Sequence, residues 1–404
     1  LGFDYVYLTP VHPIGEARRK GSVGSPYAIS DYRAVDPDLG GEPALRRFID
    51  TAHDRGLGVI MDVVYNHTSP DSVLARTHPE WFWKDASGAP CPRVADWSDV
   101  VDLDYSHRGL WDYQIETLER WSAFGADGFR CDVASLVPAE FWAEARRRLD
   151  AARPAGSPEG ARPLLWLAES VHKEFVAELR RRGQYAASDP ELHAAFDLTY
   201  DYDARQELED AWAGRCSLER YLAMVAVQEA LYPEGAVKLR FLENHDQPRA
   251  AWRFGAGARL RNWTLFAMLL PGAFLAYMGE ELALSERIGL FDREPMDRSE
   301  GSPEFRDFFA RAHALSKRIR AEAPLFDARV LGEGLVLVER SGPGAARYAA
   351  ILNLDGRSGR FPAGPWPALS GEDLLSGAAQ ETGPGAPIGA EPSVFAGGPR
   401  REPL

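Results

Sequence analysis

Short apolar runs that end in polar clusters alternate along the chain with segments whose apolar residues recur every three to four positions. The first pattern is typical of buried parallel strands, and the second of helices that pack on one face. Strands are predicted at 5–8, 58–64, 128–133, 164–168, 195–199, 239–242 and 273–278. Helices are predicted at 42–55, 108–124, 139–149 and 218–231. This alternation predicts an α/β fold built on a parallel sheet.

Seven strands separated by helices are one unit short of a (β/α)8 TIM barrel, which usually takes about 250 residues. The sequence opens inside the first predicted strand, at Leu1-Gly2-Phe3-Asp4. The barrel is therefore expected to be N-terminally incomplete, with its first β/α unit preceding Leu1. An incomplete barrel has two unpaired sheet edges, so we expect it to need cover at those edges.

Two segments depart from the strand and helix alternation. The stretch 68–107 carries four prolines among Trp81, Trp83 and Trp97, which predicts a compact insertion into the barrel. The tryptophans could form the core of this insertion or bind sugar. Beyond about residue 320, alternating runs at 334–339 and 348–354 precede a tail rich in Gly and Pro, as in an antiparallel β-sandwich. We predict a barrel domain over 1–322, including 68–107, and a C-terminal β domain over 323–404.

The composition narrows the choice of partners. A net charge of -14 over 404 residues is spread along the chain, which argues against nucleic acid and anionic membranes and favours a neutral substrate. No apolar run reaches the roughly 18 to 20 residues of a membrane-spanning helix. Three widely spaced cysteines indicate neither a disulfide framework nor a zinc site. These features favour a cytoplasmic protein, and they leave its oligomeric state open.

Charged and polar side chains stand at the carboxyl ends of four predicted strands, where a barrel places its catalytic residues. The segments are Asp62-Val-Val-Tyr-Asn66-His67, Gly128-Phe-Arg130-Cys-Asp132, Trp166-Leu-Ala-Glu169 and Phe241-Leu-Glu-Asn244-His245-Asp246. Asp132 and Glu169 close consecutive strands, which lie about 4.8 Å apart in a sheet. Their carboxyl groups are therefore expected to approach the separation of about 5 to 5.5 Å that a retaining glycosidase needs.

The surroundings of these two carboxyl groups predict different roles for them. Glu169 follows the apolar run 164–168, and partial burial should raise its pKa and keep it protonated as a general acid. Arg130 stands two residues before Asp132 on the same strand face, where its charge should keep Asp132 ionised. Asp132 is then the nucleophile.

Other strand-end residues suit substrate positioning. His67 and His245 can hydrogen-bond sugar hydroxyls, and Asp246 can hold two neighbouring hydroxyls and favour the distorted ring of the transition state. Tyr27, in the loop Ser25-Pro26-Tyr27, can stack on the apolar face of a sugar.

Each residue also has a non-catalytic interpretation. Arg130 and Asp132 could form a buried structural ion pair, and Glu169 could be the carboxylate at a helix N-terminus. The two histidines could be core or loop residues, or ligands of a metal hydrolase, although no H-x-H or H-E-x-x-H spacing is present. The occurrence of all four segments together favours the catalytic interpretation.

The four segments, with Ser25-Pro-Tyr27-Ala-Ile-Ser-Asp31-Tyr32 upstream, resemble the signature regions of glycoside hydrolase family 13, the α-amylase family, in their usual order. The resemblance covers 1 to about 320. It implies that Asp132 is the nucleophile, Glu169 the acid/base and Asp246 the third, transition-state-stabilising carboxylate. It implies substrate binding by Tyr27, His67, Arg130 and His245, and a mainly structural role for Asp62. The insertion and the β end resemble the family's domains B and C.

The sequence also departs from the common α-amylase pattern. Many members have Lys-His shortly after the nucleophile, serving the leaving-side sugars and a calcium site, whereas here Asp132 is followed by Val133-Ala134-Ser135-Leu136. We therefore expect no metal and no cofactor, with calcium as a disfavoured alternative. The run from Asn244 to Arg249 is similar to that of family α-glucosidases acting on oligosaccharides, which adds Arg249 to the predicted binding residues.

The predicted function is a retaining α-glycosidase that cleaves α-glucosidic bonds of α-glucans or malto-oligosaccharides through a covalent glycosyl-enzyme intermediate. Its partner is an oligosaccharide or polysaccharide substrate. Two alternatives stay open: a transglycosidase of the same family, such as a glucan transferase or a trehalose- or sucrose-converting enzyme, and a non-catalytic carbohydrate-binding member. The presence of all three carboxylates favours an enzyme.

Overall fold

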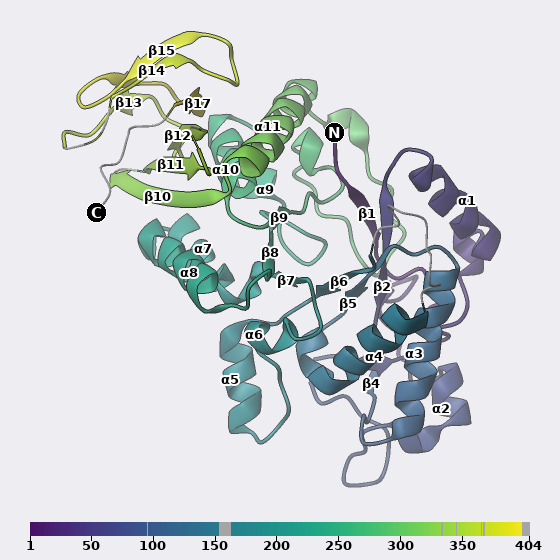
Figure 1. Ribbon diagram of the computed structural model, residues 1–404. Coiled ribbons are helices and arrows are strands. Elements are labelled where there is room, and N and C mark those ends of the chain that lie inside the picture. The colour runs from purple at the N-terminus through teal and green to yellow at the C-terminus, as the bar shows by residue number, and fades with distance from the viewer. Residues whose placement is uncertain are drawn as a thin grey trace.

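The computed structural model describes residues 1–94, 96–152, 163–332, 334–344, 346–364, 366 and 368–397. Within these ranges the larger part of the molecule is built on a curled, seven-stranded parallel sheet (Figure 1). In spatial order its strands are β1 (Tyr5–Leu8), β2 (Gly58–Val63), β5 (Gly128–Cys131), β6 (Leu165–Ala168), β7 (Leu198–Tyr200), β8 (Val237–Arg240) and β9 (Ala273–Phe274). The predicted barrel sheet of parallel strands is confirmed, and among the described residues β1 and β9 stand at the two ends of its strand order.

Helices cover the outside of the curled sheet (Figure 1). The longer ones are α1 (Gly41–His53), α3 (Arg108–Ala123), α4 (Ala139–Ala152), α5 (Lys173–Arg181), α7 (Arg205–Trp212), α8 (Leu218–Leu231), α10 (Ala258–Leu269) and α11 (Pro303–Glu322). Local sequence sets several of their starts. Ser302 caps α11 by accepting from the Phe305 amide, and Pro303 occupies the first turn, where no amide donor is needed. None of the helices that the structure describes has the length and apolar character needed to span a bilayer.

The predicted bounds were wrong for three strands. The run 195–199 begins in the turn before β7, the run 239–242 extends past the end of β8, and β9 ends four residues before the predicted 278. Phe241 and Leu242 lie outside β8 but are only 3% and 1% exposed. An apolar run reports burial, and a buried loop produces the same pattern as a buried strand.

The insertion is anchored at the end of β2. There β3 (His67–Thr68) pairs with β4 (Val101–Asp102) in antiparallel register, and the short helix α2 (Val73–Thr77) lies between them in the sequence. Trp81 is buried in the main core, which fits the packing interpretation, whereas Trp83 is 43% exposed. Trp97 contacts the His67 ring, with their centroids 5.5 Å apart.

The C-terminal part contains an antiparallel sheet in the order β10 (Leu325–Gly332), β11 (Leu335–Ser341), β12 (Arg347–Asn353) and β17 (Ser393–Ala396). Two further antiparallel pairs join β13 (Gly359–Arg360) to β16 (Pro387–Ile388) and β14 (Leu369–Glu372) to β15 (Ala379–Thr382). One face of the larger sheet packs against α10 and α11. The predicted domain limits stay predictions, and 398–404 lie outside the described residues.

Candidate active site

The four strand-end segments converge at the carboxyl ends of the barrel strands. Asp132 and Glu169 each follow directly after a strand, β5 and β6. These strands are neighbours in the sheet, with Cys131 paired to Ala168, so the predicted adjacency of the two carboxylates is confirmed. Both residues are nearly buried, at 6% and 8% exposure.

Arg130 lies at the centre of the site. Its guanidinium is fully buried and contacts three carboxylates: Nη1 lies 2.8 Å from Asp132 Oδ1 and 2.9 Å from Asp62 Oδ2, and Nη2 lies 2.6 Å from Glu169 Oε1. One positive charge therefore faces three carboxyl groups in a site shielded from water. Such an excess of buried negative charge favours a proton on one of these groups.

Burial raises the pKa of both Asp132 and Glu169, and the nearby Glu169 raises that of Asp132 further. Arg130 lowers both pKa values, because it contacts both carboxylates. The charge of Arg130 was expected to keep Asp132 ionised, but burial and the neighbouring Glu169 outweigh it, and the Asp132 pKa is raised. The spacing of Arg130 and Asp132 in the sequence predicted their contact. Only the pairing of β5 with β6 brings Glu169 to the same guanidinium.

The turn after the nucleophile candidate also holds Glu169. Val133 has a φ of +36°, in the left-handed region that β-branched residues rarely adopt. In this conformation the Val133 amide donates a 2.8 Å hydrogen bond to Glu169 Oε2. The strained turn thus fixes the carboxyl group of Glu169, a function that the sequence analysis did not assign to Val133.

Tyr27, His245 and Asp246 form a second group beside the carboxylate pair. The Tyr27 hydroxyl lies 2.6 Å from His245 Nε2 and donates to Asp62 Oδ2 at 3.1 Å. His245 Nε2 also lies 3.0 Å from Asp246 Oδ2. Burial opposes ionisation of Asp246, but the hydrogen bond from His245 and the nearby charges of Arg130 and Arg287 together outweigh it, so the Asp246 pKa is lowered. The Asp246 side chain is 41% exposed, so the site opens to solvent on this side.

His67 approaches Asp132 from the insertion side, with Nε2 at 3.9 Å from Asp132 Oδ2. Burial lowers the pKa of His67 to about 4, so its ring is neutral at pH 7. His67 and His245 lie against different carboxylates, Asp132 and Asp246. Among the described residues, no group of three or more His, Cys, Asp and Glu side chains is arranged to hold a metal ion.

Arg249, one of the predicted substrate-binding residues, lies inside the protein. Its side chain is 1% exposed, and Nη1 lies 2.6 Å from Glu243 Oε1 and 2.9 Å from the Met278 carbonyl oxygen. Nε donates to the Glu286 carbonyl at 3.0 Å. Glu243, which is buried after β8, is the ion-pair partner of Arg249 inside the protein. The presence of Glu243 in the segment 241–246 was the sequence feature that could have predicted this ion pair.

Two tyrosines at the end of β7 belong to the site but were missed. The Arg130 guanidinium lies over the Tyr200 ring, 5.7 Å from its centroid. The Tyr202 hydroxyl accepts a 2.8 Å hydrogen bond from Asn244. The run Thr199-Tyr200-Asp201-Tyr202 places aromatic and acidic residues at a strand end, which is the same signal that identified the other four segments.

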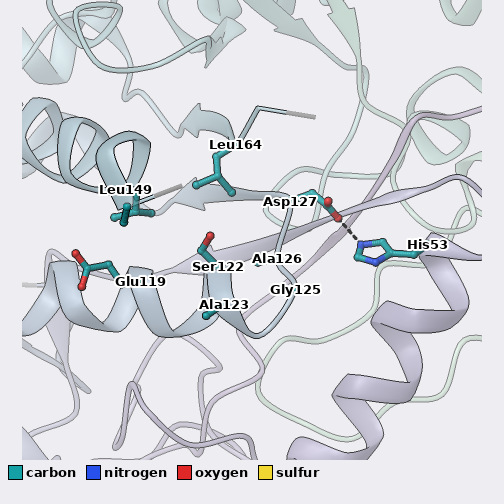
Figure 2. A pocket seen from close by; sticks show the side chains of 10 residues that line it. His53, Glu119, Ser122, Ala123, Gly125, Ala126, Asp127, Leu149 and Leu164 are labelled. Carbon is teal, nitrogen blue, oxygen red and sulfur yellow. Dashed lines mark hydrogen bonds and ion pairs between the residues drawn. The ribbon is translucent and has the colours of Figure 1, made fainter. Parts of the chain in front are cut away.

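A hollow of about 620 Å³ lies at the opposite end of the strands (Figure 2). Asp127 precedes β5 and Leu164 precedes β6, so this hollow faces the amino ends of the strands. His53 and Asp127 pair there at 2.7 Å. In TIM barrels this end contributes to stability, and active sites lie at the other end.

Comparison with known proteins identifies the family. The family model described as "Alpha amylase, catalytic domain" matches residues 1–90 and 75–317. An α-amylase from Lactobacillus plantarum has a similar structure, with a TM-score of 0.89, 39% identity, and coverage of 98% of this chain and 91% of that chain. The maltogenic α-amylase AmyB from Thermotoga neapolitana is also similar, with a TM-score of 0.82, 31% identity, and coverage of 98% of this chain and 90% of that chain.

Among curated relatives, an alpha-1,4-glucan:maltose-1-phosphate maltosyltransferase from Salinibacter ruber is 36% identical over 176 residues, which are 37% of this chain and 26% of that protein. The chain spans between about a quarter and a half of the length of the curated relatives it matches. The family match covers nearly the whole barrel, including the four strand-end segments. The chain therefore belongs to the α-amylase family of glycoside hydrolases, family 13.

Proposed function

We propose that this chain is a retaining α-glycosidase that acts on α-glucosidic bonds of α-glucans or malto-oligosaccharides. The observation that carries the proposal is the shared guanidinium of Arg130, which holds the carboxyl groups of Asp132 and Glu169 side by side. A nucleophile must reach the anomeric carbon directly, whereas an inverting pair leaves room for water at about 6.5 to 9.5 Å. One guanidinium that contacts both carboxyl groups limits how far apart they can lie, and this supports retention.

In the first step, Glu169 protonates the glycosidic oxygen while an Asp132 oxygen attacks the anomeric carbon. The bond from that carbon to the leaving oxygen breaks, and a β-linked glycosyl ester forms on Asp132. Burial raises the pKa of both carboxyl groups and so favours one proton on the pair, which we place on Glu169. Arg130 offsets part of the negative charge of Asp62 and Asp132.

In the second step, Glu169 acts as the base. Esterification removes the charge of Asp132, so one negative neighbour disappears and the pKa of Glu169 falls. Glu169 then takes a proton from water or a sugar hydroxyl, whose oxygen attacks the anomeric carbon and releases Asp132. Two inversions retain the α configuration.

The surrounding residues hold the sugar that forms the ester. Asp246 stays ionised and is open to solvent, so it can accept hydrogen bonds from sugar hydroxyls. His245 positions Asp246, and Tyr27 links His245 to Asp62. All of these groups are side chains of the chain itself, so we propose that the reaction needs no cofactor.

Transfer in place of hydrolysis is the second candidate. A relative that matches 37% of this chain is named as a maltosyltransferase, and the second step differs only in the acceptor. Incubation with maltoheptaose and a labelled maltose acceptor separates the two. Hydrolysis predicts shorter glucans alone, and transfer predicts labelled longer products.

The primary test measures turnover of p-nitrophenyl α-glucosides, maltoheptaose and soluble starch by the wild type and by Asp132→Ala. We expect the variant to lose at least a thousandfold in kcat, with azide restoring turnover as a β-glycosyl azide. Asp127→Asn, in the hollow of Figure 2, is the matched control and should keep wild-type kinetics. Proton NMR of the first product should show the α anomer.

Two outcomes would contradict the proposal. A β anomer as the first product would indicate inversion. Absence of turnover by the wild type on every α-glucan, disaccharide and aryl α-glucoside would favour the non-catalytic carbohydrate-binding member.

A further inference from the structure

Arg93 links the insertion to the segment that follows β2. Its Nη2 donates to Asn66 Oδ1 at 2.6 Å, and its Nε donates to Asp102 Oδ2 at 2.7 Å. Asn66 and Asp102 are both fully buried, and the Arg93 side chain is 14% exposed. A guanidinium with two short bonds to buried partners has a fixed orientation.

This contact determines which way the Asn66 amide points. A guanidinium can only donate hydrogen bonds, so the group that faces it must be the Asn66 carbonyl oxygen. The amide nitrogen of Asn66 then faces His67 Nδ1, at 3.0 Å. An amide nitrogen also only donates, so Nδ1 must accept and cannot carry a proton.

The proton of the neutral His67 ring therefore lies on Nε2, which faces Asp132 Oδ2 at 3.9 Å. That distance is too long for a direct hydrogen bond. A sugar hydroxyl placed beside Asp132 can accept from Nε2, whereas the other tautomer would offer the hydroxyl no donor.

We infer that Arg93 is a positioning residue, which acts through Asn66 to fix the Nε2–H tautomer of His67 and so provides a hydrogen-bond donor beside the nucleophile. This inference rests on the proposed function for its catalytic consequence. The tautomer itself follows from the contacts of three side chains and can be measured without substrate.

The same contacts bear on calcium. A calcium ion needs about six to eight oxygen ligands. Here Asn66 Oδ1 and Asp102 Oδ2 already accept from Arg93, and Asp102 Oδ1 is the remaining side-chain oxygen of the two residues. These donors do not fit calcium, because the ion would have to displace the guanidinium. Arg93 supplies the positive charge between the insertion and the barrel.

The spectroscopic test uses protein labelled with ¹⁵N-histidine, with the His67 signals assigned by their loss in His67→Gln. In the wild type we expect the shifts of a neutral ring protonated at Nε2. Asn66→Asp keeps the acceptor for Arg93 but turns a carboxylate oxygen toward Nδ1, so it should move the proton to Nδ1 while Arg93 stays in place. Shifts of an Nδ1–H ring in the wild type would overturn the inference, whatever the activity of the chain.

The kinetic test is a double-mutant cycle. Arg93→Met should lower kcat/KM by about tenfold, as expected for one lost hydrogen bond. The same loss should be nearly absent in the His67→Gln background, because both changes remove one donor. Arg33→Met is the matched control, since Arg33 pairs with Glu116 away from the site. Additive losses would show that Arg93 acts independently of His67 and would overturn the inference.

Arg93→Lys covers the case in which Arg93→Met does not fold. Lysine keeps the charge but reaches one partner at a time, so the His67 ring should show a mixture of tautomers.

The absence of a calcium requirement is tested by thermal unfolding of the wild type. A chelator should leave its melting temperature unchanged, and added calcium should not raise it. A rise of several degrees with calcium would show that the ion displaces or joins Arg93.

Discussion

Arg130 contacts both carboxyl groups of the candidate pair, so its charge lowers the pKa of each of them. A guanidinium that contacts Asp62, Asp132 and Glu169 cannot distinguish nucleophile from acid by its own charge. Burial raises the pKa of both Asp132 and Glu169. One proton on the pair is the state that the first step of retention needs.

The raised pKa of Glu169 gives a prediction for the pH profile. An ordinary glutamate titrates at about 4.3, so the alkaline limb of kcat/KM should lie above that pH. In Glu169→Gln, assayed with an α-maltosyl fluoride whose leaving group needs no acid, this limb should disappear from the glycosylation step. An unchanged alkaline limb in the variant would assign it to another group.

His67 predicts how stability changes with pH. Its pKa is about 4 in the folded chain and about 6.5 in the unfolded chain, so the unfolded chain binds more protons between these values. The free energy of unfolding should therefore fall as the pH decreases from 6.5 toward 4, by on the order of 3 kcal/mol from this residue.

Urea unfolding of His67→Gln at pH 7.5 and 4.5 measures this contribution. The variant should lose less stability than the wild type over that interval. His78→Gln, at an exposed histidine, is the control and should follow the wild type. Equal pH dependence in wild type and His67→Gln would show that the ring is not buried as a neutral group.

A buried ionic network joins several elements on one side of the barrel. Lys238 on β8 contacts Asp189 at the start of α6 (Asp189–Leu192) at 2.6 Å and Asp203 at 2.8 Å. Its ammonium also donates to Thr199 and to the Tyr200 carbonyl on β7. All its donors are therefore used, as a buried ammonium requires.

Removing this cation should strongly destabilise the fold. Lys238→Met leaves two buried carboxylates without their partner, which is expected to cost about 3 to 5 kcal/mol. The cost should be smaller at acid pH, where these carboxyls take up protons. Lys317→Met, whose side chain is 47% exposed, should cost less than about 1 kcal/mol. A loss for Lys238→Met no larger than for Lys317→Met would contradict the prediction.

At the scale of the whole molecule, the barrel and the C-terminal sheet share a core. Residues of α10 and α11 pack with Val336, Val338, Ala350 and Leu352 of that sheet. Arg340 on β11 is 3% exposed and donates from Nε and Nη2 to the Leu269 carbonyl at the end of α10, at 3.0 and 2.7 Å. The two parts are therefore expected to unfold together.

Arg340→Met tests this contact between the barrel and the C-terminal sheet. The Leu269 carbonyl would lose its partners in a buried site, so unfolding should become easier by about 1 to 3 kcal/mol. Calorimetry should still show one transition, and kcat/KM should stay at the wild-type value because Arg340 lies outside the candidate site. Two separate transitions in the wild type would instead favour domains that unfold independently near the predicted limit of 322.

The sequence by itself determined the fold class and most of the candidate site. The apolar period is a local property, so β1, β2, β5 and β6 and the helices α1, α3, α4 and α8 begin or end within a few residues of prediction, whereas α5, α7, α10 and α11 were not predicted. Side-chain chemistry at the strand ends is equally local. Asp132, Glu169 and Asp246 were therefore found without coordinates, although their roles remain proposals.

Only the tertiary structure decided which charges meet. Arg130 reaches Glu169 because β5 pairs with β6, and Arg249 turns inward because Glu243 is buried beside it. Arg93 faces Asn66 because the insertion folds back along β4. Each of these contacts joins segments from different elements or depends on burial in a loop, and residue patterns record the presence of a charge but not the partner that packing brings to it.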